Sequence, residues 1–182
     1  TLFRSNTNSY LIEDDFDSEF RINSNPVTSI YQLNREHVIF FSSFSTTIYP
    51  GFRLSYSILP DELINKYINT YSGYTNNVST LIQLALRDFL ENEYASHVNK
   101  IKKIYLKKRN LIIDILKKYD FLEIYPDKNY LSLLVKIKKN INDKELLDSF
   151  KKESIKIEMI SSYDINNRNS KTLIIGYTGI KD

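Results

Sequence analysis

Two short apolar runs, each leading directly into polar side chains, constrain the fold of this chain most. Residues 9–13 (SYLIE) close on the acids Glu13, Asp14 and Asp15, and residues 37–42 (HVIFFS) lead into a stretch rich in Ser and Thr. Short apolar runs of this kind are typical of buried parallel strands that meet their C-terminal loops. Open α/β sheets bind ligands just beyond the carboxyl ends of such strands. The two runs therefore predict an α/β fold with a polar ligand site at one sheet edge.

The following hundred residues are predicted to be mostly helical. An apolar segment from Phe52 to Leu59 stops at Pro60, and the acids that follow it mark the start of a helix over 61–71. Apolar residues at helical spacing begin again near Asn76 or Asn77 and continue to about residue 119. This pattern predicts either one long helix or two helices joined near Glu93.

The remainder of the chain reads as a small α+β domain. Strands are predicted at 121–124 and 130–137, with Pro126 and Asn129 turning the chain between them. Asn142 is expected to cap a helix from Asp143 to about Glu153, followed by strand-like segments at 155–160 and 173–179. We therefore expect one domain over residues 1–119, including the long helix, and a second over 120–182.

Composition excludes several classes of function. The 182 residues contain no cysteine, which rules out a disulfide framework and thiolate metal sites and makes the cytoplasm the expected location. Lys+Arg 25 against Asp+Glu 22 leaves a net charge of +3, too small an excess to indicate nucleic acid or a membrane surface. No apolar run approaches the roughly 18 residues of a membrane span, so a soluble protein is expected. The chain begins at Thr1 without an initiator Met, and we expect that sequence precedes it.

Four motifs, in order along the chain, resemble one family. They are EDDFDSEFR (Glu13 to Arg21), FSSFSTTIYPGFRLSY (Phe41 to Tyr56), the basic HVNKIKKIYLKKRNLIIDIL (His97 to Leu116) and LIIGY (Leu173 to Tyr177). Together they resemble the aminotransferase-like domain of MocR-subfamily, GntR-type transcriptional regulators. The resemblance implies the α/β fold of pyridoxal 5′-phosphate (PLP) dependent transferases of fold type I: part of the large domain followed by the small α+β domain.

The resemblance places Asp14 beside the pyridine nitrogen of PLP. A carboxylate there keeps the nitrogen protonated, which lets the ring accept electrons; a helix-capping or loop acid is the alternative. Phe16 stands where the family usually has a tyrosine whose hydroxyl bonds the cofactor, and a phenyl ring cannot donate that bond. Asp15, Asp17 and Glu19 have no such assignment and are expected to be surface or structural residues.

A phosphate group is expected near Ser43, Ser45 and Arg53, which match the phosphate ligands of the family. Hydroxyls, backbone N–H groups and a fixed cation suit a group that carries nearly two negative charges. The alternative is that the serines are ordinary loop residues and that Arg53 is a structural ion-pair partner.

Thr46 is the decisive position, because the family has its Schiff-base lysine there. A threonine hydroxyl cannot form the covalent bond through which that lysine holds PLP and shuttles protons. Lys66 and the lysines from Lys100 onward are too far along the chain to replace it. We therefore expect PLP to bind non-covalently at most. Natural decay of the site and deliberate replacement of the lysine would both produce this sequence.

Three further features concern other ligands. Ile174 occupies the place where aminotransferases of this fold usually carry an arginine for the substrate carboxylate, and Arg168, in a polar loop upstream, is more simply a solvated residue. The basic stretch after His97 keeps apolar residues at helical spacing, so an amphipathic helix with a solvated cationic face is favoured over nucleic-acid binding. His37 and His97 lack metal-ligand companions.

The resemblance implies an effector-sensing, non-enzymatic domain of a MocR/GntR-type bacterial regulator. Its effector would be an amino acid or a PLP-like molecule, it would form a homodimer, and it would contact DNA only through a preceding winged-helix module. One alternative is a fragment of a class I/II aminotransferase whose lysine has been mutated. Another is a structural or dimerisation remnant that binds no ligand.

Overall fold

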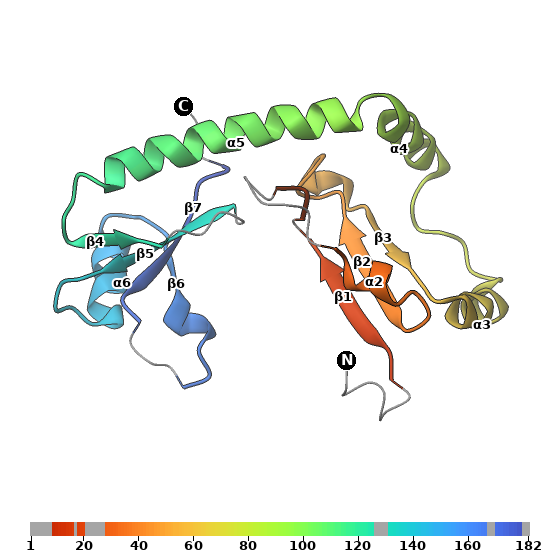
Figure 1. Ribbon diagram of the computed structural model, residues 1–182, viewed down its shortest axis with the longest axis horizontal. Helices are drawn as coiled ribbons and strands as arrows, with labels where there is room; N and C mark the ends of the chain where they lie inside the picture. Colours follow the sequence, from red (N-terminus) through yellow and green to blue (C-terminus); the bar gives the residue numbers. More distant parts are fainter. Residues whose placement is uncertain (1–8, 17, 21–27, 126–130, 167–169, 180–182) are drawn as a thin grey trace. The chain divides into compact units, whose positions relative to one another are not determined.

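A computed structural model describes residues 9–16, 18–20, 28–125, 131–166 and 170–179 (Figure 1). The chain divides into two compact units, one formed by residues 1–19 and 25–98 and the other by residues 20–24 and 99–182. Asp17, Arg21, the turn residues Pro126 and Asn129, and Arg168 lie outside the described residues. The predicted domain boundary at residue 119 stays a prediction.

The first unit contains a three-stranded sheet in the order β1-β2-β3, together with short and long helices (Figure 1). Its elements are β1 (Leu11–Asp15), α2 (Ile30–Leu33), β2 (Val38–Ser43), the 3-10 turn η2 (Pro50–Phe52), β3 (Ser55–Ile58), α3 (Asp61–Tyr71) and α4 (Thr80–Asn92). The 3-10 turn η1 (Ser18–Phe20) follows β1, and its last residue, Phe20, belongs to the second unit.

The pairing of β1 with β2 fixes where the two polar clusters lie. The strands are parallel, with Leu11 opposite Val38 and Asp15 opposite Ser42, so their carboxyl ends lie at the same sheet edge, as predicted. The three acids, expected in the loop after the strand, instead lie within β1. β3 runs antiparallel to β2, with Ser43 opposite Ser55.

One face of this sheet is covered by α2. Val38 and Phe40 are buried there, and the ring of Tyr31 contacts that of Phe40. The Glu13 carboxylate accepts hydrogen bonds from the Ser29 hydroxyl at 2.7 Å and from the N–H groups of Ile30 and Tyr31. Glu13 thereby satisfies N–H groups at the start of α2 that have no partner within the helix. Of the three acids, this one has a structural role.

The helices of the first unit largely follow the sequence pattern. α3 has the predicted bounds, because Pro60 precedes two acids in its first turn. The second helix begins at Thr80 rather than near Asn76 or Asn77, since the Asn76 side chain accepts from the N–H of Val78 and holds a turn there. Of the two alternatives for the following stretch, two helices are correct. α4 ends at Asn92, and α5 (Tyr94–Leu116) begins after Glu93.

The second unit has an antiparallel sheet in the order β4-β5-β7-β6 (Figure 1). Its elements are α5 from Asn99 onward, β4 (Leu122–Ile124), β5 (Ser132–Ile137), α6 (Asp143–Lys152), β6 (Glu158–Met159), the 3-10 turn η3 (Ile160–Tyr163) and β7 (Thr172–Gly176). Leu133, Val135 and Tyr177 form a fully buried cluster against which apolar residues of α5 pack. The amphipathic reading of α5 agrees with this packing.

Two predictions in this unit have different outcomes. Asn142 caps α6 as predicted, because its side-chain oxygen accepts from the N–H of Glu145 at 2.8 Å. The strand expected over 155–160 is reduced to Glu158 and Met159, and a 3-10 turn begins at Ile160. Within the described residues, no helix is both long and apolar enough to cross a membrane.

Candidate functional site

A cavity of about 380 Å³ lies where β2 ends, and we call it the hydroxyl cavity. Five of the six residues singled out from the sequence line it. They are Phe16, Ser43, Ser45, Thr46 and Arg53, joined by Pro50, Leu54 and Ser55. The residue after β1, the last residue of β2, the segment that follows it and the first residue of β3 thus contribute side chains to one concave surface.

Asp14, the sixth residue, is not among the residues that line the hydroxyl cavity. It lies near the end of β1 opposite Phe41, and therefore on the same sheet face as Ser43, two positions further along β2. Two residues along a strand span about 7 Å. In PLP the ring nitrogen and the phosphate are separated by part of the ring and by a methylene ester, so the two groups need not occupy the same cavity.

The backbone turn that carries the hydroxyls is held from several directions. The N–H of Phe44 donates to Leu54 O at 3.0 Å, and the N–H of Ile48 donates to Phe44 O at 2.9 Å. Thr47 is fully buried, and its carbonyl oxygen lies 2.9 Å from Nε2 of His97, a residue of α5. Since a ring N–H is the only group of that pair that can donate, His97 fixes the turn to the helix.

Thr46 ties the turn to the end of β1. Its hydroxyl Oγ1 donates to the carbonyl oxygen of Phe16 at 3.1 Å. The Ser43 hydroxyl in the same cavity is buried and has no hydrogen-bond partner among the described residues. A buried hydroxyl without a partner costs about 1–3 kcal/mol, which an incoming phosphate oxygen would recover. The residues present therefore fit a phosphorylated ligand.

Arg53 supplies the positive charge of the hydroxyl cavity. It is exposed, and within the described residues no carboxylate pairs with its guanidinium. Its backbone is left-handed, with φ 49°, at the end of the 3-10 turn η2. That conformation costs a non-glycine residue on the order of 1–2 kcal/mol. The chain thus places a guanidinium at this point against the preference of its backbone.

A second layer of side chains supports η1 and the start of α5. The Tyr94 hydroxyl donates to Glu19 Oε1 at 3.0 Å, and the Tyr94 ring packs edge-on against Phe44 and Phe89. Burial raises the pKa of Tyr94 to about 12, and the negative charge of Glu19 acts in the same direction. Tyr94 therefore stays neutral, and Glu19 has a structural role, as expected.

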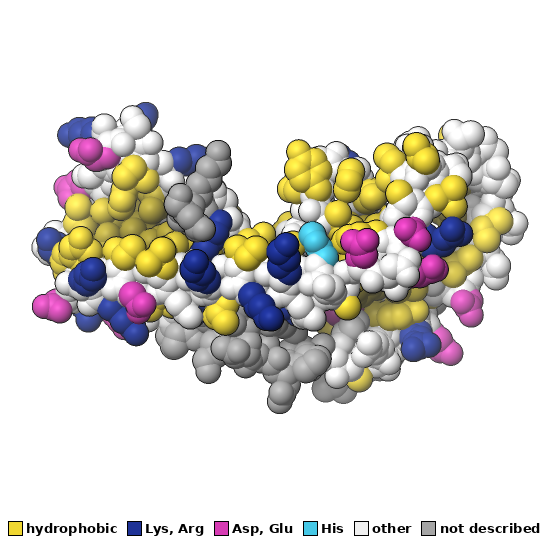
Figure 2. Space-filling model, turned by 90° about the horizontal axis from the view of Figure 1, so that it is seen from above, with side chains coloured by type: hydrophobic (Ala, Val, Ile, Leu, Met, Phe, Trp, Pro, Cys, Tyr) yellow, Lys and Arg dark blue, Asp and Glu magenta, His cyan; other side chains and the backbone are white. Residues whose placement is uncertain are grey.

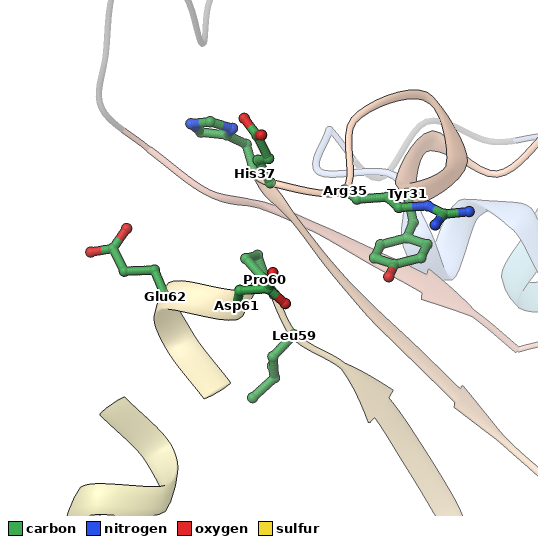
Figure 3. Close-up of a pocket in the computed structure, with 8 residues that line it drawn as sticks. Tyr31, Arg35, His37, Leu59, Pro60, Asp61 and Glu62 are labelled. Atoms are coloured by element: carbon green, nitrogen blue, oxygen red, sulfur yellow. The ribbon is translucent and has the colours of Figure 1, made fainter. Parts of the chain in front are cut away.

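Another cavity, of about 510 Å³, lies at the opposite end of β2 (Figure 3). Its lining includes Arg35 and three acidic residues, Glu36, Asp61 and Glu62, beside His37. Three carboxylates against one cation disfavour a phosphate dianion there. This cavity therefore provides an internal comparison for Arg53: the arginine that lines it, Arg35, has acidic neighbours, whereas no acidic residue is among the described residues that line the hydroxyl cavity.

The remaining candidates have no ligand-binding arrangement in the described part of the chain. No group of three or more His, Asp or Glu side chains could hold a metal ion among those residues. Ile174 lies in the middle of β7, opposite Leu134 and Glu158. On the face of α5 that Figure 2 shows, Lys and Arg side chains are spread along the helix with apolar side chains between them. Lys100, Lys103 and Lys107 are exposed, as a solvated cationic face requires.

Comparison with known protein families shows which family the chain belongs to. Residues 3–169 match the model of the family described as aminotransferase class I and II. The chain belongs to this family.

Among solved structures, this aminotransferase-like chain is similar in fold to the multiple substrate aminotransferase of Thermococcus profundus. The TM-score is 0.80 at 20% identity, and the match covers 99% of this chain and 46% of that one. It is also similar to LysN, the alpha-aminoadipate aminotransferase of Thermus thermophilus, in complex with N-(5'-phosphopyridoxyl)-L-leucine, with a TM-score of 0.77, 18% identity, and coverage of 97% and 47%. These likenesses confirm the α/β, fold type I architecture.

Several curated relatives of the aminotransferase-like chain are transcription regulators. The HTH-type transcriptional regulator YdeL of Bacillus subtilis (strain 168) is 33% identical over 178 residues, which cover 96% of this chain and 38% of that protein. The "Probable rhizopine catabolism regulatory protein MocR" of Rhizobium meliloti is 24% identical over 175 residues, covering 94% and 36%. The chain thus spans well under half the length of these relatives. The predicted resemblance to MocR/GntR-type regulators is confirmed.

Sequence reasoning did not identify Pro50, Leu54 and Ser55 in the cavity lining, nor the role of His97. Ser55 reaches the hydroxyl cavity through its pairing with Ser43 across β2 and β3. His97 was set aside for want of metal-ligand companions, yet it binds the carbonyl of Thr47, 50 positions away in the sequence. No local signal reveals such a contact. The only indication in the sequence that His97 matters was its place at the start of the basic motif that resembles the family.

Proposed function

We propose that this chain is the effector-sensing domain of a MocR/GntR-type bacterial transcription regulator and binds a phosphorylated pyridoxal-type molecule without a covalent bond. DNA binding would belong to a winged-helix module elsewhere in a longer protein. A homodimer in the cytoplasm completes the proposal. Its support is the family of the chain, the regulators among its relatives and the chemistry of the hydroxyl cavity.

One observation carries the proposal: Thr46 lines the same cavity as Ser43, Ser45 and Arg53. The last three would hold the phosphate, through two hydroxyls and a guanidinium. Thr46 stands beside them where the family has lysine, and its hydroxyl is a poor nucleophile without an activating base. When bound, the cofactor would supply an electron-accepting ring, which Asp14 would hold at its nitrogen.

A pyridoxal-phosphate-dependent aminotransferase is the second candidate, and the solved structures similar to this chain favour it. It would need a lysine at position 46 and an anchor for the substrate carboxylate, whereas Thr46 and Ile174 occupy these places. A remnant that binds no ligand is the third candidate. The Ser43 hydroxyl, buried and without a partner among the described residues, argues against it, because a site without a ligand gains nothing from keeping that group.

Titration with PLP, followed by borohydride reduction and peptide mapping, separates the three candidates. The sensor predicts saturable, reversible binding with no adduct at position 46 and no amino-group exchange. The aminotransferase predicts a reducible covalent adduct and transamination of an amino acid. The remnant predicts no saturable binding at all, and that result would overturn the proposal.

Restoring the lysine tests the location of the pocket. The Thr46→Lys protein is expected to gain a borohydride-reducible PLP adduct that maps to residue 46, because the new amine would lie in the cavity that holds the phosphate. Thr70→Lys, on the exposed surface of α3, is the matched control for the background reaction of surface lysines. Equal labelling of residues 46 and 70 would show that the cavity is not the cofactor site.

A further inference from the structure

The orientation of the Thr46 hydroxyl limits which ligand group can bind beside it. A hydroxyl has a single proton to donate and two lone pairs that accept. Thr46 uses its proton on the carbonyl oxygen of Phe16, which can only accept. The part of the hydroxyl that remains for a ligand in the cavity is therefore a hydrogen-bond acceptor.

Position 46 faces a definite part of a pyridoxal-type ligand under the proposed function. The family's lysine reacts with the carbon attached to ring position 4, so Thr46, which replaces that lysine, would lie beside the same carbon. The carbon bears an aldehyde in pyridoxal phosphate, whose oxygen only accepts. It bears an amine in pyridoxamine phosphate, which is protonated at neutral pH and donates up to three hydrogen bonds.

We propose that Thr46 is a specificity-determining residue that makes the site select the amine form, pyridoxamine 5′-phosphate, over the aldehyde form. The inference rests on the proposed function and adds the chemical class of the preferred ligand. An ammonium would donate to Thr46 Oγ1 while the bond from Thr46 to Phe16 stays intact. An aldehyde oxygen would meet lone pairs, or would require the hydroxyl to turn and leave the Phe16 carbonyl without that partner.

A measurable but limited preference is expected. Thr46 is partly exposed, so water can replace a lost partner of the Phe16 carbonyl and reduces the cost of turning the hydroxyl. We expect pyridoxamine phosphate to bind about tenfold more tightly than pyridoxal phosphate, which corresponds to about 1.4 kcal/mol. The phosphate contacts of Ser43, Ser45 and Arg53 would be common to both ligands and cancel in this ratio.

Four phosphates that differ only at the position-4 carbon test the inference with the intact protein. Pyridoxamine phosphate donates, pyridoxine phosphate donates and accepts, 4-deoxypyridoxine phosphate does neither, and pyridoxal phosphate accepts. Calorimetry is expected to give the lowest Kd for the amine, an intermediate value for the alcohol, and the highest values for the methyl and aldehyde forms. The aldehyde is measured by competition with the amine, and mass spectrometry identifies any adduct with surface lysines.

Two substitutions at position 46 show whether its hydroxyl sets the order. Thr46→Val keeps the shape and removes the acceptor, so the Kd of the methyl ligand divided by the Kd of the amine should fall to near one. Thr46→Ser keeps the hydroxyl and should keep the preference. An unchanged ratio in Thr46→Val, or equal affinities of all four ligands for the unsubstituted protein, would overturn the inference and leave the proposed function standing. Binding of none of the four would instead overturn the proposed function.

Discussion

The sheet of the second unit buries Leu133, Val135 and Met159 completely, whereas the sheet of the first unit leaves Ile12 65% and Phe41 41% exposed. The polar cavity with the hydroxyls and Arg53 belongs to the less covered sheet, at the edge where β1 and β2 end. The difference indicates a division of labour within one chain. The apolar core of the second unit supports folding, whereas the hydroxyl cavity of the first unit is the part to which the proposed function assigns binding.

Leu133→Ala should have the largest effect and should leave binding unchanged. The side chain is fully buried, so its truncation is expected to lower the free energy of unfolding by about 3 kcal/mol. Urea denaturation measures the loss, and calorimetry should return the Kd of the unsubstituted protein for pyridoxamine phosphate. Leu111→Ala is the matched control, because Leu111 is 59% exposed. A higher Kd for pyridoxamine phosphate in Leu133→Ala would show that the core of the second unit also affects binding, and would contradict the distinction between the two units.

Arg53→Ala should produce the converse pattern. Loss of the guanidinium is expected to weaken the binding of pyridoxamine phosphate roughly 100-fold, or by about 2–3 kcal/mol, with little change in the free energy of unfolding. Arg35→Ala removes an exposed arginine from the acidic cavity at the other end of β2 and should change the Kd less than twofold. Similar losses in both variants would point to a general effect of net charge rather than to the hydroxyl cavity.

Glu13→Gln should give the smallest effect, and one that depends on pH. Burial alone would raise the pKa of Glu13, but the hydrogen bonds from Tyr31, Ser29 and Ile30 outweigh it and hold the pKa below its ordinary value of 4.5. The charged carboxylate therefore stabilises the fold above about pH 4.5, and this contribution is lost as the pH falls through the lowered pKa.

The expected loss in Glu13→Gln at pH 7 is about 1 kcal/mol, because an amide oxygen accepts the same hydrogen bonds more weakly. Urea denaturation of both proteins at pH 7 and pH 3 measures the difference between them, which should shrink at the lower pH. Calorimetry at pH 7 should show an unchanged Kd for pyridoxamine phosphate. A difference that grows on acidification would contradict the role of this carboxylate in capping α2.

The sequence predicted local elements well where the signal was local. Pro60 and the two acids after it mark the start of α3, and Asn142 caps α6 as its side chain allows. The predicted strand before Ile160 was too long, because an apolar run forms a strand only as far as a neighbour pairs with it, and β7 pairs with only two of these residues. Strand pairing depends on distant residues, which a single sequence does not display.

The candidate site shows the same division. The family resemblance indicated Phe16, Ser43, Ser45, Thr46 and Arg53, and these five residues do line one cavity. Asp14, placed by the same motif, lies on the neighbouring strand outside the cavity lining, and its role stays a prediction. The bond from Thr46 to Phe16, on which the proposed ligand preference rests, joins residues 30 positions apart and could not be read from spacing.

Under the proposed function, the buried Ser43 hydroxyl would link the lifetime of the protein in a cell to the supply of its ligand. That group has no hydrogen-bond partner among the described residues, and a bound phosphate would supply one and shift the population away from the unfolded state by mass action. Proteases remove chains chiefly through that state. The abundance of such a protein would rise with the concentration of its effector, before any effect on transcription.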